Sequence, residues 1–146
     1  MSFIEDVLSN KAVVVPLIAW FTAQALKVIG VIINEKKLDF TRFIGSGGMP
    51  SSHSSLVVSL AVVIGKNYGW QSGLFGVALM FSLIVMYDAA GVRRAAGKQA
   101  KVLNKLIFSN KHDINVDEKL KELLGHTPFE VLMGAALGIF MGLSLG

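Results

Sequence analysis

The chain contains no cysteine, only three prolines and few charged residues. The missing cysteine excludes two kinds of cross-link, and the scarcity of charge argues against an ordinary soluble protein. Without cysteine it can form neither disulfides nor thiolate metal sites, so composition does not indicate the redox state of its compartment. Charged residues make up 16% of the 146 residues, whereas 53% are hydrophobic. With a mean hydropathy of +0.59, the chain is too apolar for an ordinary soluble domain of this length. We therefore expect a single membrane-embedded domain over residues 1–146.

Long apolar stretches account for this composition. Near-continuous apolar runs cover residues 12–33, 70–89 and 129–146, each close to the roughly 20 residues that a helix needs to cross a bilayer. Residues 51–68 are a weaker candidate because they begin with serines and a histidine. We interpret them as a fourth span with a polar start, and a buried re-entrant segment is the alternative. The expected fold class is all-α, a small polytopic bundle of about four spans.

Basic residues predict how this bundle is oriented. With four spans, the first and third loops lie on the same side of the membrane, and they contain most of the lysines and arginines. The other side has only Lys11 and Lys66. The positive-inside rule then places the basic side in the cytoplasm and both termini outside. We expect an integral protein of a bacterial plasma membrane, with residues 90–125 as a cytoplasmic insert.

The insert begins with a basic amphipathic pattern. Apolar residues recur at helical spacing, and another face contains Arg94, Lys98, Lys101 and Lys105. Such a helix can lie on a membrane surface, so we expect anionic membrane lipids as partners. An ordinary solvated face is the alternative. We expect no nucleic-acid partner, and the formation of a homo-oligomer stays open.

Two short segments combine a helix start with a histidine. The first is Gly47-Gly48-Met49-Pro50-Ser51-Ser52-His53-Ser54-Ser55, and the second is Gly125-His126-Thr127-Pro128-Phe129-Glu130. Glycines allow the backbone to curl, Pro50 and Ser51 suit a helix start, and the first amides of a helix can bind a phosphate. Because both segments lie at helix starts on one side of the membrane, His53 and His126 form a candidate catalytic pair.

The same segments resemble the motifs of a known superfamily. Pro50-Ser51-Ser52-His53 is similar to the Pro-Ser-Gly-His motif of the type 2 phosphatidic acid phosphatases, and Gly125 to Val131 with Gly134 is similar to the end of their Gly-x-His-x-x-x-Asp-Val-x-x-Gly motif. Residues 86–94 and 97–100 resemble the signature of the divergent branch of that superfamily, which is related to acid phosphatases and vanadium-dependent haloperoxidases. The resemblance covers nearly the full chain.

The resemblance implies a metal-independent, vanadate-sensitive phosphatase that needs no cofactor. Its substrate would be a lipid or isoprenoid phosphate, hydrolysed through a phosphohistidine intermediate. By the resemblance, His126 attacks phosphorus, Glu130 orients the His126 ring, and His53 protonates the leaving oxygen. The implied phosphate-binding residues are Lys27, Arg42, Ser51, Ser52, Arg93 and Arg94. This chemistry is physically sound, because a neutral imidazole is a nucleophile and fixed cations stabilise a transferring phosphoryl group.

The chain also departs from the family pattern. Ser52 replaces a glycine, and Glu130 replaces an aspartate. No basic residue lies shortly before the second histidine, so we interpret that motif as split by the insert, with Arg93 or Arg94 in the missing place. Either arginine can bind phosphate, pair with Asp88 or anchor the loop. The chain has fewer spans than the usual six-helix architecture.

Structural roles compete with the catalytic ones. Glu130 follows Thr127 by three residues, which is a capping box, so helix capping explains it as well as catalysis does. Ser51 is an expected N-cap whatever the function.

The first motif of the family, Lys-x6-Arg-Pro, is missing from this chain, and Lys27 and Arg42 are its substitutes. A lysine inside an apolar span either faces a polar cavity or extends to the interface, and we interpret Lys27 as a phosphate ligand.

Two other functions stay open. The segment from Asp88 to Arg94 superficially resembles the Asp-Gly-Ala-Arg core of CDP-alcohol phosphotransferases, although such metal-dependent chemistry needs several carboxylates and this segment offers one. The second alternative is a catalytically silent protein that binds lipid phosphates with the same fold. Release of phosphate without added metal would separate the expected enzyme from both.

Overall fold

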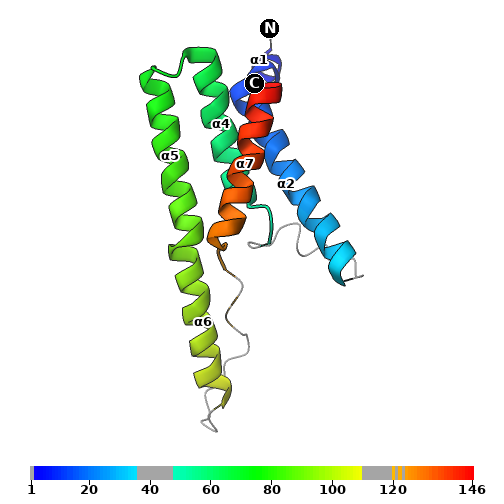
Figure 1. Cartoon of the computed structure of the whole chain (residues 1–146), viewed down its shortest axis with the longest axis vertical. Helices are drawn as coiled ribbons and strands as arrows, with labels where there is room; N and C mark the ends of the chain where they lie inside the picture. Colours follow the sequence, from blue (N-terminus) through cyan, green and yellow to red (C-terminus); the bar gives the residue numbers. More distant parts are fainter. Residues whose placement is uncertain (1, 36–47, 110–119, 121, 123) are drawn as a thin grey trace.

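The computed structural model describes residues 2–35, 48–109, 120, 122 and 124–146, and within them it contains helices and no strand (Figure 1). The helices are α1 (Phe3–Ser9), α2 (Lys11–Glu35), α4 (Ser52–Tyr68), α5 (Gly73–Ala90), α6 (Val92–Ser109) and α7 (Pro128–Leu145). The expected all-α fold is confirmed. Arg42, a predicted phosphate ligand, lies outside the described residues.

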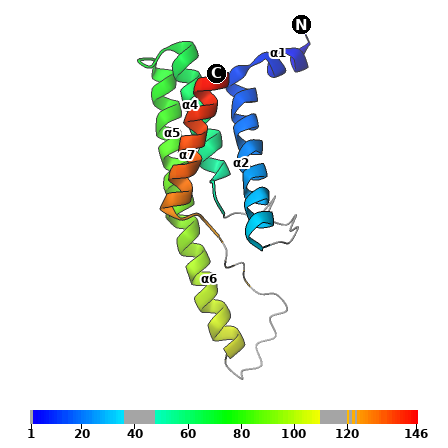
Figure 2. The same ribbon diagram turned by 45° about the vertical axis from the view of Figure 1, so that its right-hand side comes forward.

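The central helix of the bundle is α4. It packs against α2, α5 and α7, and α2 also contacts α7. Both views show these four helices side by side (Figures 1 and 2). No side chain of α4 between Ser52 and Gly65 is exposed. The polar start of this helix is therefore held inside the bundle, at the end where α7 also begins.

Three helices of the described chain have the length and composition to cross a membrane. They lie within Lys11–Ile33, Gly73–Ile107 and Pro128–Leu145, in agreement with three of the four expected spans. The helix α4 has 17 residues, which corresponds to about 25 Å. It does not reach the length of the other three, and it lies among them. The count of four spans is therefore approximate, whereas the four-helix arrangement is clear.

Glycines allow α7 to approach α4 closely. Gly134, Gly138 and Gly142 recur at every fourth position of α7 and are all buried. A Cβ atom at Gly138 would lie 2.7 Å from the carbonyl oxygen of Ser55. Because lipid is as apolar as the side chains, close packing of this kind and interhelical hydrogen bonds hold membrane helices together.

Buried serines supply such hydrogen bonds on the other sides of α4. Ser55 Oγ donates to the carbonyl of Ala19 in α2 at 3.1 Å. From α5, Ser82 Oγ donates to the carbonyl of Val57 at 2.7 Å. Each hydroxyl is thus satisfied by a carbonyl of a neighbouring helix, and α4 is tied to both of its other partners.

The basic helix α6 buries a face against the protein that its amphipathic pattern did not single out. It continues α5 in nearly the same direction and extends beyond the ends of α4 and α7 (Figures 1 and 2). Lys98, Lys101 and Lys105 are exposed as expected. The buried face, however, consists of Gly97, Ala100 and Asn104, while the larger apolar residues Val92, Val102, Leu103 and Leu106 are exposed. Tertiary contacts with the segment before α7, not hydrophobicity, select the buried face.

Substitution of Gly138 tests the close packing of α4 and α7. We expect Gly138→Ala to destabilise the protein by about 1–3 kcal/mol, because the new methyl group overlaps backbone atoms of α4. In the matched control Gly76→Ala, on α5, the methyl group would meet nothing within 4 Å, so only the gain in helix propensity remains. The melting temperatures of the two variants in detergent are compared by monitoring thermal unfolding with circular dichroism. Equal melting temperatures would contradict the proposed packing.

Candidate functional site

The two predicted histidines lie next to each other. His53 is in the first turn of α4, and His126 lies two residues before α7 begins. Their ring centroids are 6.1 Å apart with an interplanar angle of 62°. Two segments more than 70 residues apart in the sequence therefore meet at one end of the bundle, as the shared topological side predicted.

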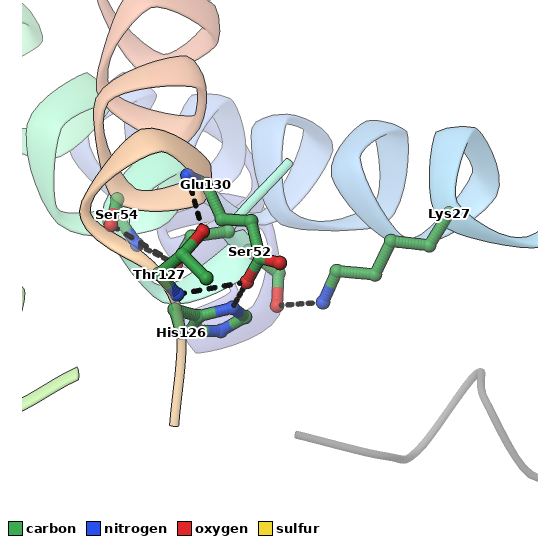
Figure 3. Close-up of polar contacts among 7 residues, drawn as sticks. Lys27, Ser52, Ser54, His126, Thr127 and Glu130 are labelled. Carbon is green, nitrogen blue, oxygen red and sulfur yellow. Dashed lines mark hydrogen bonds and ion pairs between the residues drawn. The ribbon is translucent and has the colours of Figure 1, made fainter. Parts of the chain in front are cut away.

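His126 is held on two sides, and one ring nitrogen is left unpaired. Its backbone N–H donates to the carbonyl of Ala89 at 2.8 Å. Its Nδ1 lies 3.0 Å from Glu130 Oε2 (Figure 3). The residue is only 2% exposed, and its buried Nε2 has no hydrogen-bond partner in the described part of the chain. Because a carboxylate only accepts, Nδ1 carries the proton, and the lone pair of Nε2 is available.

The surroundings of His126 favour the neutral ring. Burial lowers the pKa of His126, while the hydrogen bond from its ring to Glu130 and the charge of that carboxylate act in the opposite direction. The positive charges of Lys27 and Arg93 also lower the pKa. His126 is therefore neutral at pH 7, which is the state that a nucleophilic imidazole needs.

Glu130 serves as a cap and as a partner of His126 at the same time. Its Oε2 accepts a hydrogen bond from the backbone of Thr127 at 3.2 Å, and Thr127 Oγ1 accepts one from the Glu130 amide at 3.3 Å (Figure 3). The backbone carbonyl of Glu130 also accepts from the Ser51 amide at 3.0 Å. The capping and catalytic interpretations are thus compatible, since one oxygen atom makes both side-chain contacts.

Lys27 faces the interior of the bundle. The residue is 4% exposed, and its Nζ donates to Ser52 Oγ at 3.2 Å (Figure 3). The alternative, in which the lysine extends to the interface, is therefore excluded. This contact brings together two of the predicted phosphate ligands, from α2 and from the start of α4.

Ser51 has the structural role that its position predicted. It is the N-cap of α4, and its Oγ accepts from the amide of Ser54 at 3.4 Å and from the Ser54 hydroxyl at 3.0 Å. The amides of Ser51 and Ser54 are therefore already engaged. Of the helix-start amides expected to bind phosphate, those two are occupied by groups of the protein itself.

Arg93 is the arginine at the site. Its Nη1 lies 3.4 Å from His53 Nε2, and its Nε donates to Asp88 Oδ2 at 2.7 Å. Arg94 is half-buried, and within the described residues no contact joins its side chain to either histidine. Of the two arginines considered for the split motif, Arg93 is thus the one whose side chain lies beside His53. Sequence reasoning weighed the pairing with Asp88 but could not choose between the two arginines.

Comparison with known proteins identifies the family. The model of the divergent PAP2 family matches residues 8–141. The chain belongs to this family. The membrane protein YuiD of Bacillus subtilis (strain 168), which is described as uncharacterized, is 40% identical over 152 residues and covers 96% of both chains. No solved structure matches the chain. Membership of the divergent PAP2 family confirms the motif resemblance and indicates a phosphatase-related membrane protein.

The protonation state of His126 can be measured directly. In the protein labelled with ¹⁵N-histidine in micelles, we expect a neutral ring at pH 7 with the proton on Nδ1, because burial disfavours the cation. The ring should protonate only below the ordinary value of about 6.5. Glu130→Gln removes a charge that raises this pKa and should lower it further, and His126→Asn assigns the signal. A proton on Nε2 at pH 7, or titration above the ordinary value, would contradict the arrangement.

Proposed function

We propose that this divergent PAP2 protein is a metal-independent phosphatase that hydrolyses a lipid or isoprenoid phosphate through a phosphohistidine at His126. The observation that supports it best is the buried, unpaired Nε2 of His126 on a ring whose Nδ1 is held by Glu130. Buried polar atoms in proteins nearly always have a partner, so an unpaired one beside two cations invites a ligand. An electrophilic phosphorus is such a ligand.

The residues present divide the chemistry between them. The Nε2 lone pair of His126 attacks phosphorus while the bond to the leaving oxygen breaks, and His53 supplies the proton that this oxygen needs. Water then attacks the phosphorus while the P–Nε2 bond breaks and His53 takes the proton of the water, so inorganic phosphate is released and His126 is regenerated. Arg93 of α6, which contacts His53, and Lys27 of α2, which donates to the neighbouring Ser52, offset the charge on the phosphoryl oxygens. The basic residues near the site favour the cytoplasmic face of the plasma membrane.

The alternatives have less support. A CDP-alcohol phosphotransferase needs several carboxylates around divalent ions, and no group of three or more histidine, cysteine, aspartate or glutamate residues in the described ranges could hold a metal ion. A silent phosphate-binding protein would keep the cations but would not need the free nitrogen of His126. The orientation of that ring by Glu130 favours the enzyme.

The test is hydrolysis of phosphate esters by the detergent-solubilised protein in the presence of a chelator. We expect phosphate release from at least one member of a panel of phosphatidate, phosphatidylglycerophosphate and undecaprenyl pyrophosphate, with competitive inhibition by vanadate. Toward acid pH, kcat/KM should fall as His126 becomes protonated, below the ordinary histidine pKa of about 6.5. Activity that requires a divalent ion and ignores vanadate would favour the transferase.

Substitutions separate the roles of the two histidines. His126→Ala should abolish turnover of every substrate, because no phosphoenzyme can form. His53→Ala should cost on the order of 100-fold with alkyl phosphates and much less with p-nitrophenyl phosphate, whose leaving group needs little protonation. Labelled phosphate should be trapped on His53→Ala and not on His126→Ala. His112→Ala, which changes the third histidine of the sequence, is the control. Label on His126→Ala would refute the assignment.

A further inference from the structure

The junction between α5 and α6 contains groups that contact both histidines of the site. The two helices meet at Gly91, the single residue between them. Its φ of −101° and ψ of −83° depart from helical values, although its amide still donates to the carbonyl of Tyr87 at 2.8 Å and its carbonyl accepts from the amide of Ala95 at 2.9 Å. The turn of chain around Gly91 contains Ala89, whose carbonyl accepts from the backbone N–H of His126 at 2.8 Å, and Arg93, whose guanidinium lies 3.4 Å from His53 Nε2. The relative position of these groups therefore depends on the geometry of this turn.

Close contact with Gly125 reinforces the junction. Gly125 has a φ of +81°, and a Cβ atom there would lie 2.8 Å from the carbonyl carbon of Arg93. The residue before His126 is thus pressed against the backbone of the first turn of α6. Only glycine combines this conformation with this proximity. The contact fixes the main chain of Arg93 but does not determine where its side chain points.

The side chain of Arg93 needs a further restraint. It is 46% exposed and the Asp88 side chain is 37% exposed, so neither is locked by packing. Their 2.7 Å contact joins Asp88 Oδ2 in α5 to Nε of Arg93 in α6, on the two sides of Gly91. Because Asp88 occupies Nε, the two terminal nitrogens of the planar guanidinium remain available in a fixed orientation. One of these nitrogens is the atom nearest His53.

We propose that Asp88 is a positioning residue, which holds the Arg93 guanidinium across the Gly91 junction so that its terminal nitrogens face the phosphate site beside His53. This inference rests on the proposed phosphatase function. Asp88 itself touches no reacting atom. Its side chain contacts Arg93, so we expect most of its contribution to depend on the presence of Arg93.

A double-mutant cycle tests this dependence. We expect Asp88→Ala to lower kcat/KM about tenfold, because the arginine loses its orientation. Arg93→Ala should lower kcat/KM further. The double variant should match Arg93→Ala within a factor of about two, since residues acting through one contact are not additive. The same cycle is measured on the inhibition constant of vanadate. Losses that multiply in the double variant would overturn the proposal.

Two further measurements separate positioning from a general structural role. Asp88→Asn keeps an oxygen that can accept from Nε, so its activity should lie between those of Asp88→Ala and the wild type. The acid limb of the pH profile, set by His126, should stay in place in Asp88→Ala, because Asp88 is not among the groups that shift the pKa of His126. A displaced limb, or Asp88→Asn no better than Asp88→Ala, would indicate a structural collapse and overturn the inference.

Controls distinguish a failure of the positioning role of Asp88 from a failure of the proposed phosphatase function. Lys98→Ala changes an exposed charge of the same helix and should leave kcat/KM and the vanadate constant unchanged. Elution in size-exclusion chromatography confirms that each variant is folded. If the wild type releases no phosphate from any substrate, the proposed function fails. If the wild type is active and Asp88→Ala behaves like Lys98→Ala, the function stands and the positioning role of Asp88 fails.

Discussion

The start of α7 is tied to the start of α4 through Glu130, and the rest of the site depends on this link. The backbone carbonyl of Glu130 binds the amide of Ser51, and its carboxylate binds both the Thr127 amide and the His126 ring. These three hydrogen bonds of Glu130 hold the start of α4, cap the start of α7 and orient the His126 imidazole. Because the His126 ring is buried, its bond to Glu130 would be the most costly of the three to leave unmade.

This link forms where the helices can approach most closely. The glycines of α7 bring its backbone against that of α4, and Gly134 lies directly against the carbonyl of Ser51. Larger residues in these places would separate the two helix starts, and with them Glu130 and Ser51. In a membrane protein the packing of small residues therefore does more than stabilise the bundle. It also determines how near the groups at the helix ends can come.

The positive charges reach the site by different routes. Lys27 projects from the second half of the long apolar helix α2 and is held by Ser52, whereas Arg93 lies in the first turn of α6 and is held by Asp88. A buried ammonium needs its polar partner to be tolerated in the bundle. A half-exposed guanidinium needs a partner to be ordered. Both cations are thus held by tertiary contacts with residues of other helices.

Sequence alone was sufficient for the class of fold, three membrane-crossing helices, the family and the two histidines, because apolar run length, helix-start residues and motif spacing are local properties. It also predicted the cap formed by Thr127 and Glu130. It could not decide which arginine joins the site, which face of α6 is buried or whether Lys27 points inward. Those outcomes depend on residues distant in the chain, such as Leu120 against Asn104 of α6 and Ser52 against Lys27 of α2. Tertiary structure alone decides them, because the partner of a side chain depends on which backbones pack together. Local sequence does not encode which distant segments of the chain become neighbours.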